Sequence, residues 1–523
     1  MVAFCLVLRY NPAAMIAHLQ SAAFFGIEAV PIEVEVDVAR RGFAGAAIVG
    51  LPDAAVKESI ERVRSALQNS GYQFPRYKTV VNLAPADLRK EGPIFDLPIA
   101  LGIIFANGEV VAEESDKYLV LGELALDGRV RRVRGALSAA MLAQQRGFRG
   151  IIVPEENSAE AAVVDGLSVI PVTCLTEAIG FLSGQLPIEP VTVDLDAVFA
   201  ASSVYDRDFA DVRGQEHVKR AMAIAAAGMH NVLLIGPPGS GKTMLAKRLP
   251  TILPPLLLAE SLETTRIHSV AGELKAGQPL LATRPVRCPH HSASTPAMVG
   301  GGTIPQAGEV SLAHHGVLFL DEFPEFSRQT LEALRQPLED GTVTIARAHM
   351  TICFPASFMM VAAMNPCPCG YFTDPRKPCK CTAPQIDKYL ARISGPLVDR
   401  IDIHVEVPAV PFIELRSERD GTPSSSVREQ VLAARKHQRA RFGADSVMTN
   451  GRMGTKLVRK HCKLDESGEL ILRQAMTELG LSARAHDKIL RISRTIADLA
   501  DAENIAAEHV AEAIHYRRLD RQL

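Results

Sequence analysis

The sequence predicts an α/β protein with a phosphate-binding core and a helical C-terminal part. An apolar run at residues 232–235 leads into the pattern Gly-x-x-x-x-Gly-Lys-Thr at residues 236–243, which lies between a strand and a helix in nucleotide-binding proteins. Short apolar runs alternate with helical stretches on both sides of this pattern, as they do in parallel sheets covered by helices. From Val427 onward a 3.6-residue hydrophobic period dominates, which favours helices.

Length and composition narrow the class of protein. A chain of 523 residues is long enough for about three domains. We find no apolar run of the length that a membrane helix needs, and the N-terminal residues lack the basic start and small-residue cleavage site of a signal peptide. We therefore expect a cytoplasmic protein without a membrane partner. Its net charge of −2 means that any groups that bind nucleic acid must be gathered in one place.

Changes in patterning predict the domain boundaries. Met15 is a plausible alternative start, and we expect residues 1–14 to be loose. Helical stretches at 53–69 and 135–146 lie among β-like runs in the first domain. The predicted parts are an N-terminal extension (1–18), an α/β domain (19–190), a linker (191–208), the phosphate-binding core (209–408) and a helical C-terminal domain (409–523).

The stretch "NVLLIGPPGSGKT" is the strongest motif of the chain. Its glycines let the backbone turn tightly enough to point N–H groups at phosphate oxygens. Lys242 is expected to reach the β- and γ-phosphates of ATP, and Thr243 to bind Mg²⁺. The alternative is a glycine-rich turn before a helix, which the preceding strand disfavours. The predicted phosphate loop consists of Gly236, Pro237, Pro238, Gly239, Ser240, Gly241, Lys242 and Thr243.

A second motif, which is acidic, follows an apolar run about eighty residues after the phosphate loop. In "GVLFLDEFPEF", Val317–Leu320 are apolar and Asp321 and Glu322 come next. We expect Asp321 to hold Mg²⁺ with Thr243, and Glu322 to polarise the water that attacks ATP. An acidic pair after a strand is often only a solvated turn, but its spacing from the phosphate loop favours catalysis. The two motifs together predict nucleotide hydrolysis.

The next elements resemble those of AAA+ ATPases, in the group with a hairpin before the sensor-1 strand. A predicted helix, "RQTLEALRQPLED", precedes a predicted hairpin, "GTVTIARAHMTICFP", and then the apolar strand "SFMMVAAMN". The resemblance implies that Asn365, at the end of that strand, contacts the γ-phosphate or the attacking water as sensor 1. A helix cap or a turn is the alternative role for such an asparagine.

The same resemblance implies roles for three arginines. "ARISGPLVDRIDIHVEVP" is similar to the segment that carries an arginine finger, so Arg400 is expected to act on a neighbouring subunit's ATP, with Arg392 a weaker candidate. A finger that acts in trans implies a ring, expected to be a homo-hexamer. "GLSARAHDKILRISRTIADL" resembles the sensor-2 helix of the lid domain and implies that Arg484 lies over the phosphates. Surface ion pairing or solvation is the alternative for each.

Taken over residues 15–523, the chain resembles the Mg-chelatase-like ComM/YifB family. "GLPDAAVKESIERVRSAL", "NLAPADLRKEGPIFDLPIALGI" and "LGELALDGRVRRVRGAL" look like the N-terminal domain of that family, which is similar to the S5-like protease domain of Lon. Lon carries a nucleophile in Gly-Pro-Ser, but here Gly92-Pro93 is followed by Ile94, and Leu137 stands nearest the place of the lysine partner. A Ser–Lys dyad needs both groups, so we expect no peptide hydrolysis.

The family resemblance implies a DNA motor. ComM proteins are hexameric helicases that promote branch migration during natural transformation, which implies single-stranded or branched DNA as a partner and recombination proteins as further ones. The hairpin tip offers Arg347 and His349 as DNA contacts. The insert from 266 to 302 offers Arg287, His290 and His291, together with Arg284. A protein-remodelling or chelatase-type motor and an ATP-dependent regulator are the alternatives, although no helix-turn-helix is visible.

Four cysteines directly follow the Asn365 strand. In "MNPCPCGYFTDPRKPCKC" they form two C-x-C pairs nine residues apart. Four thiolates suit tetrahedral Zn²⁺, so we predict a structural zinc site in the loop 367–381. Unligated reduced thiols and redox sensing are the alternatives. The predicted zinc ligands are Cys367, Cys369, Cys379 and Cys381.

Overall fold

The computed structural model describes residues 16–41, 43–112, 114–201, 206–302, 305–347, 350–372, 374, 376–410, 421–443 and 446–521. The chain divides into two compact units. The first comprises residues 1–198 and 262–281, and the second comprises residues 199–261 and 282–523. Helix α9, Leu258–Ala271, contains the point at which the chain passes from the second unit into the first.

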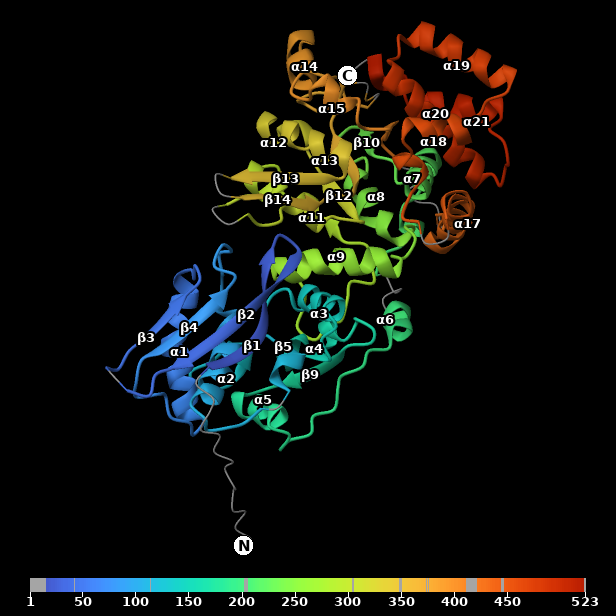
Figure 1. Ribbon diagram of the computed structural model, residues 1–523. Coiled ribbons are helices and arrows are strands. Elements are labelled where there is room, and N and C mark those ends of the chain that lie inside the picture. The colour runs from blue at the N-terminus through green and yellow to red at the C-terminus, as the bar shows by residue number, and fades with distance from the viewer. Residues whose placement is uncertain are drawn as a thin grey trace. The chain divides into compact units, whose positions relative to one another are not determined.

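The first unit is built on a seven-stranded mixed sheet (Figure 1). The first two strands form a long antiparallel hairpin, and the second has Ile32, Val34 and Val36 fully buried at every other position, as a half-buried strand requires. Three further strands add parallel to β1 on one side. In sheet order the strands are β3 Ala46–Val49, β4 Thr79–Ala84, β2 Glu28–Val38, β1 Ile16–Phe25, β5 Tyr118–Val120, β8 Gly150–Pro154 and β9 Ser168–Val172.

The helices of this unit confirm two sequence predictions. Helix α1 begins after Asp53, whose Oδ1 accepts a hydrogen bond from the Val56 N–H at 2.7 Å, so the helix predicted at 53–69 is present. The helix predicted at 135–146 is α3. Ile94 and Leu137, the residues that we expect in place of a Ser–Lys dyad, are both buried. The bounds are α1 Ala54–Asn69, α2 Asp96–Ala106, α3 Ala136–Gln145, α4 Glu155–Ala161 and α5 Leu175–Leu182, with a small ribbon of β6 Glu123–Leu124 and β7 Val130–Arg131.

The second unit contains a five-stranded sheet in which every strand pair is parallel. Its inner strands are fully apolar and almost entirely buried, because parallel sheets are covered on both faces. The strands predicted at 232–235 and 317–320 are present with those bounds. In sheet order they are β11 Val286–Arg287, β12 Val317–Leu320, β15 Met359–Met364, β10 Val232–Ile235 and β16 Ile403–Glu406.

The predicted hairpin is also present, but the helix before it is divided. Strands β13, Thr342–Arg347, and β14, Met350–Pro355, pair antiparallel as expected. The single helix predicted at 328–340 is wrong, because two helices meet at Leu334. This break places Pro337 in the first turn of α13, where a missing N–H costs no hydrogen bond. The helices of this region are α7 Glu216–Gly228, α8 Lys242–Arg248, α10 Thr295–Val299, α11 Glu309–Leu312, α12 Arg328–Ala333, α13 Arg335–Asp340, α14 Ala383–Leu390 and α15 Gly395–Val398.

The C-terminal region is helical, as the sequence predicts. Its central helix α20 carries a buried carboxylate, Asp498, which accepts hydrogen bonds from Arg441 at 2.6 Å and 3.0 Å, from Arg494 at 3.1 Å and from Asn450 at 2.7 Å. Asp498 is 2% exposed, so this network is essential to its burial. The helices are α17 Ser424–Phe442, α18 Thr455–His461, α19 Glu466–Leu479, α20 Ala483–Leu499 and α21 Ala507–His515.

A second buried ionic cluster joins α20 to the sheet. Asp402, just before β16, lies 3.2 Å from the Lys488 ammonium and 3.7 Å from the His230 ring nitrogen, and it accepts the Asn231 N–H at 3.0 Å. Burial alone would raise the pKa of Asp402, but these partners together hold it well below its ordinary value. The carboxylate is therefore charged inside the protein at neutral pH.

The segment predicted as a linker contains a short helix. A seven-residue helix, α6 Leu195–Ala201, lies within the segment 191–208, and Asp194 accepts a hydrogen bond from the Ala197 N–H at its start.

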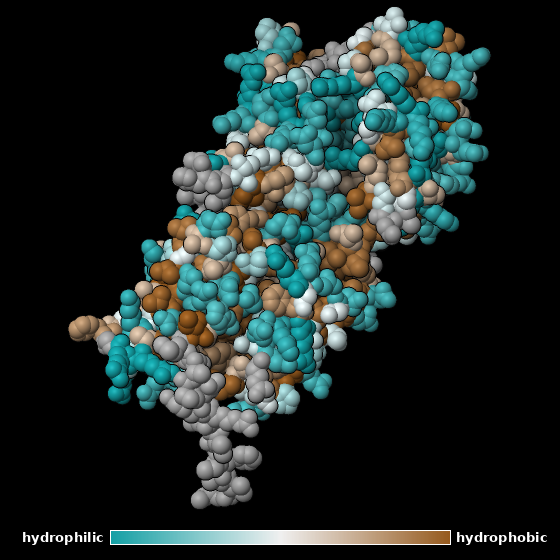
Figure 2. Space-filling view, viewed as in Figure 1, coloured by the Kyte–Doolittle hydropathy of each residue, from teal (hydrophilic) through white to brown (hydrophobic). Residues whose placement is uncertain are grey.

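Among the described residues no helix combines the length and hydrophobicity needed to cross a membrane. Figure 2 shows hydrophilic residues distributed over most of the visible face, with smaller hydrophobic patches between them.

Candidate nucleotide-binding site

The phosphate loop predicted from the sequence lies between β10 and α8, with its backbone pressed against neighbouring strands. The Gly236 N–H donates to the Met364 carbonyl at 3.2 Å. A side chain at Gly236 would lie 2.1 Å from the Val407 carbonyl oxygen, so only glycine fits there. Gly241 has a φ of 91°, which glycine adopts at little cost. Both glycines of the pattern are therefore required by geometry.

Lys242 is held at the centre of this loop. Its ammonium donates to the carbonyls of Gly236 at 2.7 Å and Pro237 at 2.9 Å, and to Oδ1 of Asn365 at 3.2 Å. The residue is 8% exposed, and burial lowers its pKa to about 8, with the charge of Asp321 acting in the opposite direction. The predicted lysine and the predicted sensor asparagine are thus in direct contact.

The acidic motif lies at the same edge of the sheet. Thr243 Oγ1 donates to Oδ2 of Asp321 at 2.7 Å, which brings the two predicted Mg²⁺ ligands together. Asp321 and Asn365 follow β12 and β15, which are parallel neighbours, and the loop follows β10 beside them. The carboxyl ends of parallel strands form the usual ligand-binding edge of an α/β sheet. The arrangement therefore brings a hydroxyl, a carboxylate, an ammonium and an amide together at one edge of the sheet.

Glu322 has a partner that we did not predict from the sequence. Its carboxylate lies 2.9 Å from Nδ1 of His291, and its backbone is left-handed with a φ of 52°. The His291 ring also lies edge-on to Phe326 and is stacked beside His290, at ring-centre distances of 6.5 Å and 4.1 Å. His291, predicted as a DNA contact, thus touches Glu322, the residue predicted to polarise the attacking water.

Gln215 is a second residue that we did not single out. Its amide Nε2 donates to the Ser240 carbonyl at 2.8 Å and to the Pro408 carbonyl at 2.9 Å, so it links the phosphate loop to the segment after β16. It is 8% exposed and adopts a φ of 57°. Gly214 in "VRGQEH" indicates a turn before α7, but nothing in that stretch predicts the contact of Gln215 with Ser240 and Pro408.

The three predicted arginines have partners or positions of their own, away from any described hydrogen bond to the phosphate loop. Arg400 forms an ion pair with Glu339 and donates to the Pro396 carbonyl at 2.7 Å. Arg392 is exposed and pairs with Glu325 at 2.6 Å. Arg484 is exposed in the first turn of α20. Within the described part of the chain, none of the three has a hydrogen bond to the loop, so their roles stay predictions.

The candidate DNA contacts have different surroundings. Arg347 is exposed at the end of β13 and donates to the Gly302 carbonyl at 3.2 Å, whereas His349 lies outside the described residues. Arg287 forms a bidentate ion pair with Glu309 at 2.6 Å and 2.8 Å. His290 is exposed. Arg284 is 8% exposed and pairs with a buried glutamate, so it belongs to the interior.

The four cysteines meet in one cluster, and none forms a disulfide. Sulfur–sulfur distances are 3.4 Å between Cys367 and Cys369, 3.7 Å between Cys367 and Cys379, and 3.6 Å between Cys369 and Cys379. A tetrahedral zinc with bonds of about 2.3 Å has sulfur–sulfur edges of about 3.8 Å. Backbone N–H groups of Phe372, Cys369 and Cys381 point at sulfurs, as expected around thiolates. The cluster fits a metal of this kind.

Known proteins resemble this chain along nearly its whole length. Residues 208–415 match the family described as "Magnesium chelatase, subunit ChlI", residues 34–157 match "Subunit ChlI of Mg-chelatase", and residues 421–517 match "Magnesium chelatase, subunit ChlI C-terminal". "Competence protein ComM" of Haemophilus influenzae is 45% identical over 513 residues, which are 97% of this chain and 98% of that protein. The chain belongs to the ComM/YifB family. "Uncharacterized protein YifB" of Escherichia coli is 44% identical over 510 residues, 97% of this chain and 98% of its own length.

Membership in the ComM/YifB family fixes the broad chemistry. The Mg-chelatase-type ATPase domain implies ATP hydrolysis with Mg²⁺, and the predicted phosphate and acidic motifs lie inside the matched range. "Lon protease 2" of Bacillus subtilis is 27% identical over 134 residues, 25% of this chain and 24% of that protein. The predicted ComM/YifB membership and Lon resemblance are therefore confirmed.

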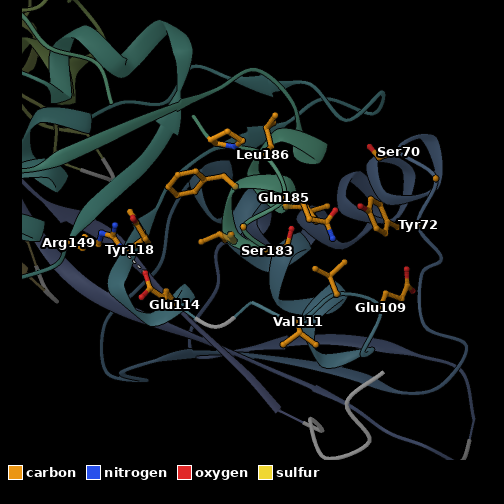
Figure 3. Close-up of a pocket in the computed structure, with 17 residues that line it drawn as sticks. Ser70, Tyr72, Glu109, Val111, Glu114, Tyr118, Arg149, Ser183, Gln185 and Leu186 are labelled. Atoms are coloured by element: carbon orange, nitrogen blue, oxygen red, sulfur yellow. Dashed lines mark hydrogen bonds and ion pairs between the residues drawn. The ribbon is translucent and has the colours of Figure 1, made fainter. Parts of the chain in front are cut away.

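A large hollow in the described part of this ComM/YifB protein lies away from the predicted nucleotide site. A hollow of about 1220 Å³ lies in the first unit and is lined by residues such as Tyr72, Glu109, Tyr118 and Gln185. Figure 3 shows Arg149 and Glu114 joined at one side of this hollow. None of the predicted site residues lines it. The candidate nucleotide site therefore rests on its converging loops and not on this hollow.

Proposed function

We propose that this protein is an ATP-driven DNA motor that works as a hexameric ring and promotes branch migration of recombination intermediates during natural transformation. Full-length similarity to a protein named for competence supports this proposal. The contact of Lys242 with Asn365 and of Thr243 with Asp321 supports its ATPase step. The motor would act in the cytoplasm, with recombination proteins as further partners.

In the proposed site, the phosphate loop binds the β- and γ-phosphates of ATP. Thr243 and Asp321, now hydrogen-bonded to each other, would hold Mg²⁺. Glu322 polarises the attacking water and Asn365 senses the γ-phosphate. Magnesium supplies charge neutralisation of the phosphates when bound. The residues of this chain orient the phosphates and the water.

We assign the remaining arginines to the ring and its lid. Arg400 would act as the finger on the ATP of a neighbouring subunit, with Arg392 as the weaker candidate, and Arg484 would close over the phosphates from the lid. The exposed position of Arg484 at a helix start is compatible with a mobile lid contact. We also assign the chain to the hairpin-containing group of AAA+ proteins and its first domain to the S5-like Lon fold, without peptidase activity.

The DNA path in this proposal runs past the hairpin of β13 and β14. Arg347 is exposed at the end of β13, and a ring of six copies would place six such charges along one channel. Contacts to phosphates do not depend on base sequence, which suits a translocating motor. His290 and Arg287 are secondary candidates, because Arg287 already has an anionic partner.

We also propose that Cys367, Cys369, Cys379 and Cys381 hold one structural Zn²⁺. Their sulfur spacing and the N–H groups directed at them support this. Metal analysis of the purified protein is expected to give one zinc per chain. A zinc-free protein of normal stability would contradict the proposal.

A chelatase-type or protein-remodelling motor is the second candidate, because all three family matches are to a magnesium chelatase subunit. A DNA experiment separates the two. ATPase rate and movement of a labelled four-way junction are measured with wild-type protein, Lys242→Ala and Arg347→Ala. Arg473→Ala is the matched control, because Arg473 is an equally exposed arginine on α19.

The DNA motor proposal predicts junction-stimulated ATP hydrolysis and strand movement by the wild type. Lys242→Ala should abolish both, since the lysine contacts the phosphates. Arg347→Ala should keep basal hydrolysis but lose stimulation, whereas Arg473→Ala should behave as the wild type. Basal hydrolysis with no DNA stimulation and no strand movement would overturn the motor proposal and favour the remodelling candidate.

A further inference from the structure

The cysteine loop, residues 367–381, packs directly on the phosphate loop. At Gly370, an added Cβ atom would lie 2.6 Å and 2.7 Å from two ring carbons of Pro238, and 3.7 Å from the Asn365 side chain. Carbon atoms do not approach so closely, so not even a methyl group fits between these segments. Gly370 has a φ of 82°, which also favours glycine. Gly370 therefore packs against Pro238 with no room for a side chain at residue 370.

The sulfur cluster determines where Gly370 lies. The Gly370 N–H donates to the Cys367 carbonyl at 2.9 Å, closing a turn from one predicted metal ligand. On either side of Gly370, the N–H of Cys369 points at the Cys381 sulfur at 3.4 Å, and the N–H of Phe372 points at the Cys367 sulfur at 3.3 Å. Any change in how the four sulfurs are held is thus passed to the turn that touches Pro238.

The phosphate loop is linked to the same turn by a second route. Asn365, whose side chain accepts the Lys242 hydrogen bond, is only two residues before Cys367. Tyr389 of α14 also bonds to the Asn365 backbone, and burial raises the pKa of this tyrosine to about 12. The cysteine loop therefore adjoins Pro238 and Asn365, and Asn365 in turn contacts Lys242.

We propose that metal binding by the four cysteines and nucleotide binding by the phosphate loop are thermodynamically coupled. The inference rests on the proposed ATPase function and on zinc as the metal. With zinc bound, the turn is fixed and supports Pro238, so the phosphate loop is pre-organised for ATP. Without zinc, four thiols joined by weak contacts hold the turn loosely, and nucleotide binding must order it. The protein then binds nucleotide only weakly when it lacks metal.

Coupling of this kind is reciprocal. If zinc raises the affinity for nucleotide by some factor, nucleotide must raise the affinity for zinc by the same factor. Coupling factors between sites in proteins are typically about 5- to 150-fold. We expect a value inside this range, because contact is direct but limited to one turn and one proline. Equality of the two factors is a stringent test.

The experiment uses the full-length protein and measures binding, not turnover. Affinity for Zn²⁺ is measured by competition with a chromogenic chelator, with and without saturating ADP. Affinity for a fluorescent ADP analogue is measured for zinc-loaded protein, for protein stripped by the chelator, and for stripped protein given zinc again. Two equal factors of about fivefold or more, with recovery on zinc addition, support the proposal.

A matched pair of glycine variants tests the route. Gly370→Ala keeps all four cysteines but forces a methyl group against Pro238, so it should retain one zinc per chain while losing nucleotide affinity and coupling. Gly480→Ala is the control, because Gly480 has a φ of 61° and nothing within 4 Å of an added Cβ. It incurs a similar backbone cost but touches no part of the site, so its coupling should equal that of the wild type.

The contrary results are distinct. Zinc-loaded and zinc-free wild type that bind nucleotide equally well would overturn the coupling, as would unequal factors. A protein that binds nucleotide but does not bind zinc at all would overturn it by removing the metal. Zinc-loaded protein that binds no nucleotide would instead refute the proposed ATPase function, and with it this inference. These contrary results all come from measurements on the wild-type protein, so none of them depends on whether a glycine variant folds.

Discussion

Among the described residues, the buried Lys242 has no anionic hydrogen-bond partner, and this predicts how ATP affinity depends on pH. Its ammonium donates to two carbonyls and one amide, and burial lowers its pKa to about 8. Bound phosphates would give the ammonium an anionic partner, which favours the charged form and raises that pKa. Nucleotide binding above pH 8 must therefore take up a proton.

The size of the effect follows from the charged fraction of Lys242. With a pKa of about 8, roughly nine-tenths of the protein carries the charge at pH 7 and roughly one-tenth at pH 9. Apparent affinity scales with the fraction of protein that is competent to bind. Between pH 7 and pH 9 the affinity for Mg–ATP should fall about tenfold, close to 1.4 kcal/mol. Below pH 7 it should be nearly constant.

Stability of the nucleotide-free protein should change in the opposite direction. The folded-state pKa lies below the unfolded value of about 10.4, so the unfolded chain binds more protons between these values. Stability contributed by this lysine therefore rises as pH increases through the folded pKa. Weaker nucleotide binding at pH 9 thus cannot be explained by loss of the fold if the unfolding midpoint is unchanged or higher.

The assay is a titration with a fluorescent ATP analogue between pH 6.5 and pH 9.5. Calorimetry at pH 8.5 in two buffers with different ionisation enthalpies should detect the proton taken up. Lys242→Ala is the control, since its residual affinity should be low and flat over this range. Wild-type affinity that stays constant to pH 9.5, with no proton uptake, would refute the reasoning, because it would require an ordinary lysine pKa.

Three further predictions concern His291, which contacts the proposed catalytic residue Glu322, and the two buried ionic clusters. His291→Ala should lower the turnover number for ATP about tenfold or more and leave nucleotide affinity unchanged, because the ring touches Glu322 and not the phosphate loop; equal loss of affinity would contradict this. Asp498→Asn should destabilise the protein to urea by about 3–5 kcal/mol by leaving buried arginine charge unpaired, whereas Asp501→Asn, at an exposed ion pair, should change it by less than about 1 kcal/mol. Asp402→Asn should make the fall in stability below about pH 5 shallower, since a carboxylate with a lowered pKa contributes stability that is lost as pH falls; an unchanged slope in acid titration would show that this carboxylate is not linked to folding.

The residues that could be predicted from the sequence are those that local pattern identifies. Gly236–Thr243, Asp321 and Asn365 each follow a short apolar strand, and parallel strands bring their carboxyl ends together. The hairpin at 342–355 was predictable because two β-like runs lie close together in the sequence. The break at Leu334 was not, because the helical pattern continues through it and only the proline at 337 marks it.

Contacts between distant segments could not be predicted in this way. His291 and Glu322 are thirty-one residues apart, and their pairing depends on β11 and β12 being neighbours. Arg287 looked like a free charge in the sequence, but its bidentate partner Glu309 lies beyond the predicted cluster. A charge run does not show which of its members are neutralised. The same holds for Gly370, whose neighbour Pro238 belongs to another strand's loop.

These distant contacts divide the site into a binding part and a turnover part. Gln215 and Gly370 touch the phosphate loop itself, so a change at either should appear first in nucleotide affinity. His291 touches the acidic side chain that we assign to the attacking water and has no hydrogen bond to the phosphate loop among the described residues, so a change there should appear in turnover. A single pair of measurements, nucleotide affinity and single-turnover rate, therefore tests whether the supporting segments act independently. If substitutions at Gln215, Gly370 and His291 all change both nucleotide affinity and single-turnover rate, the site behaves as one cooperative unit and the division is wrong.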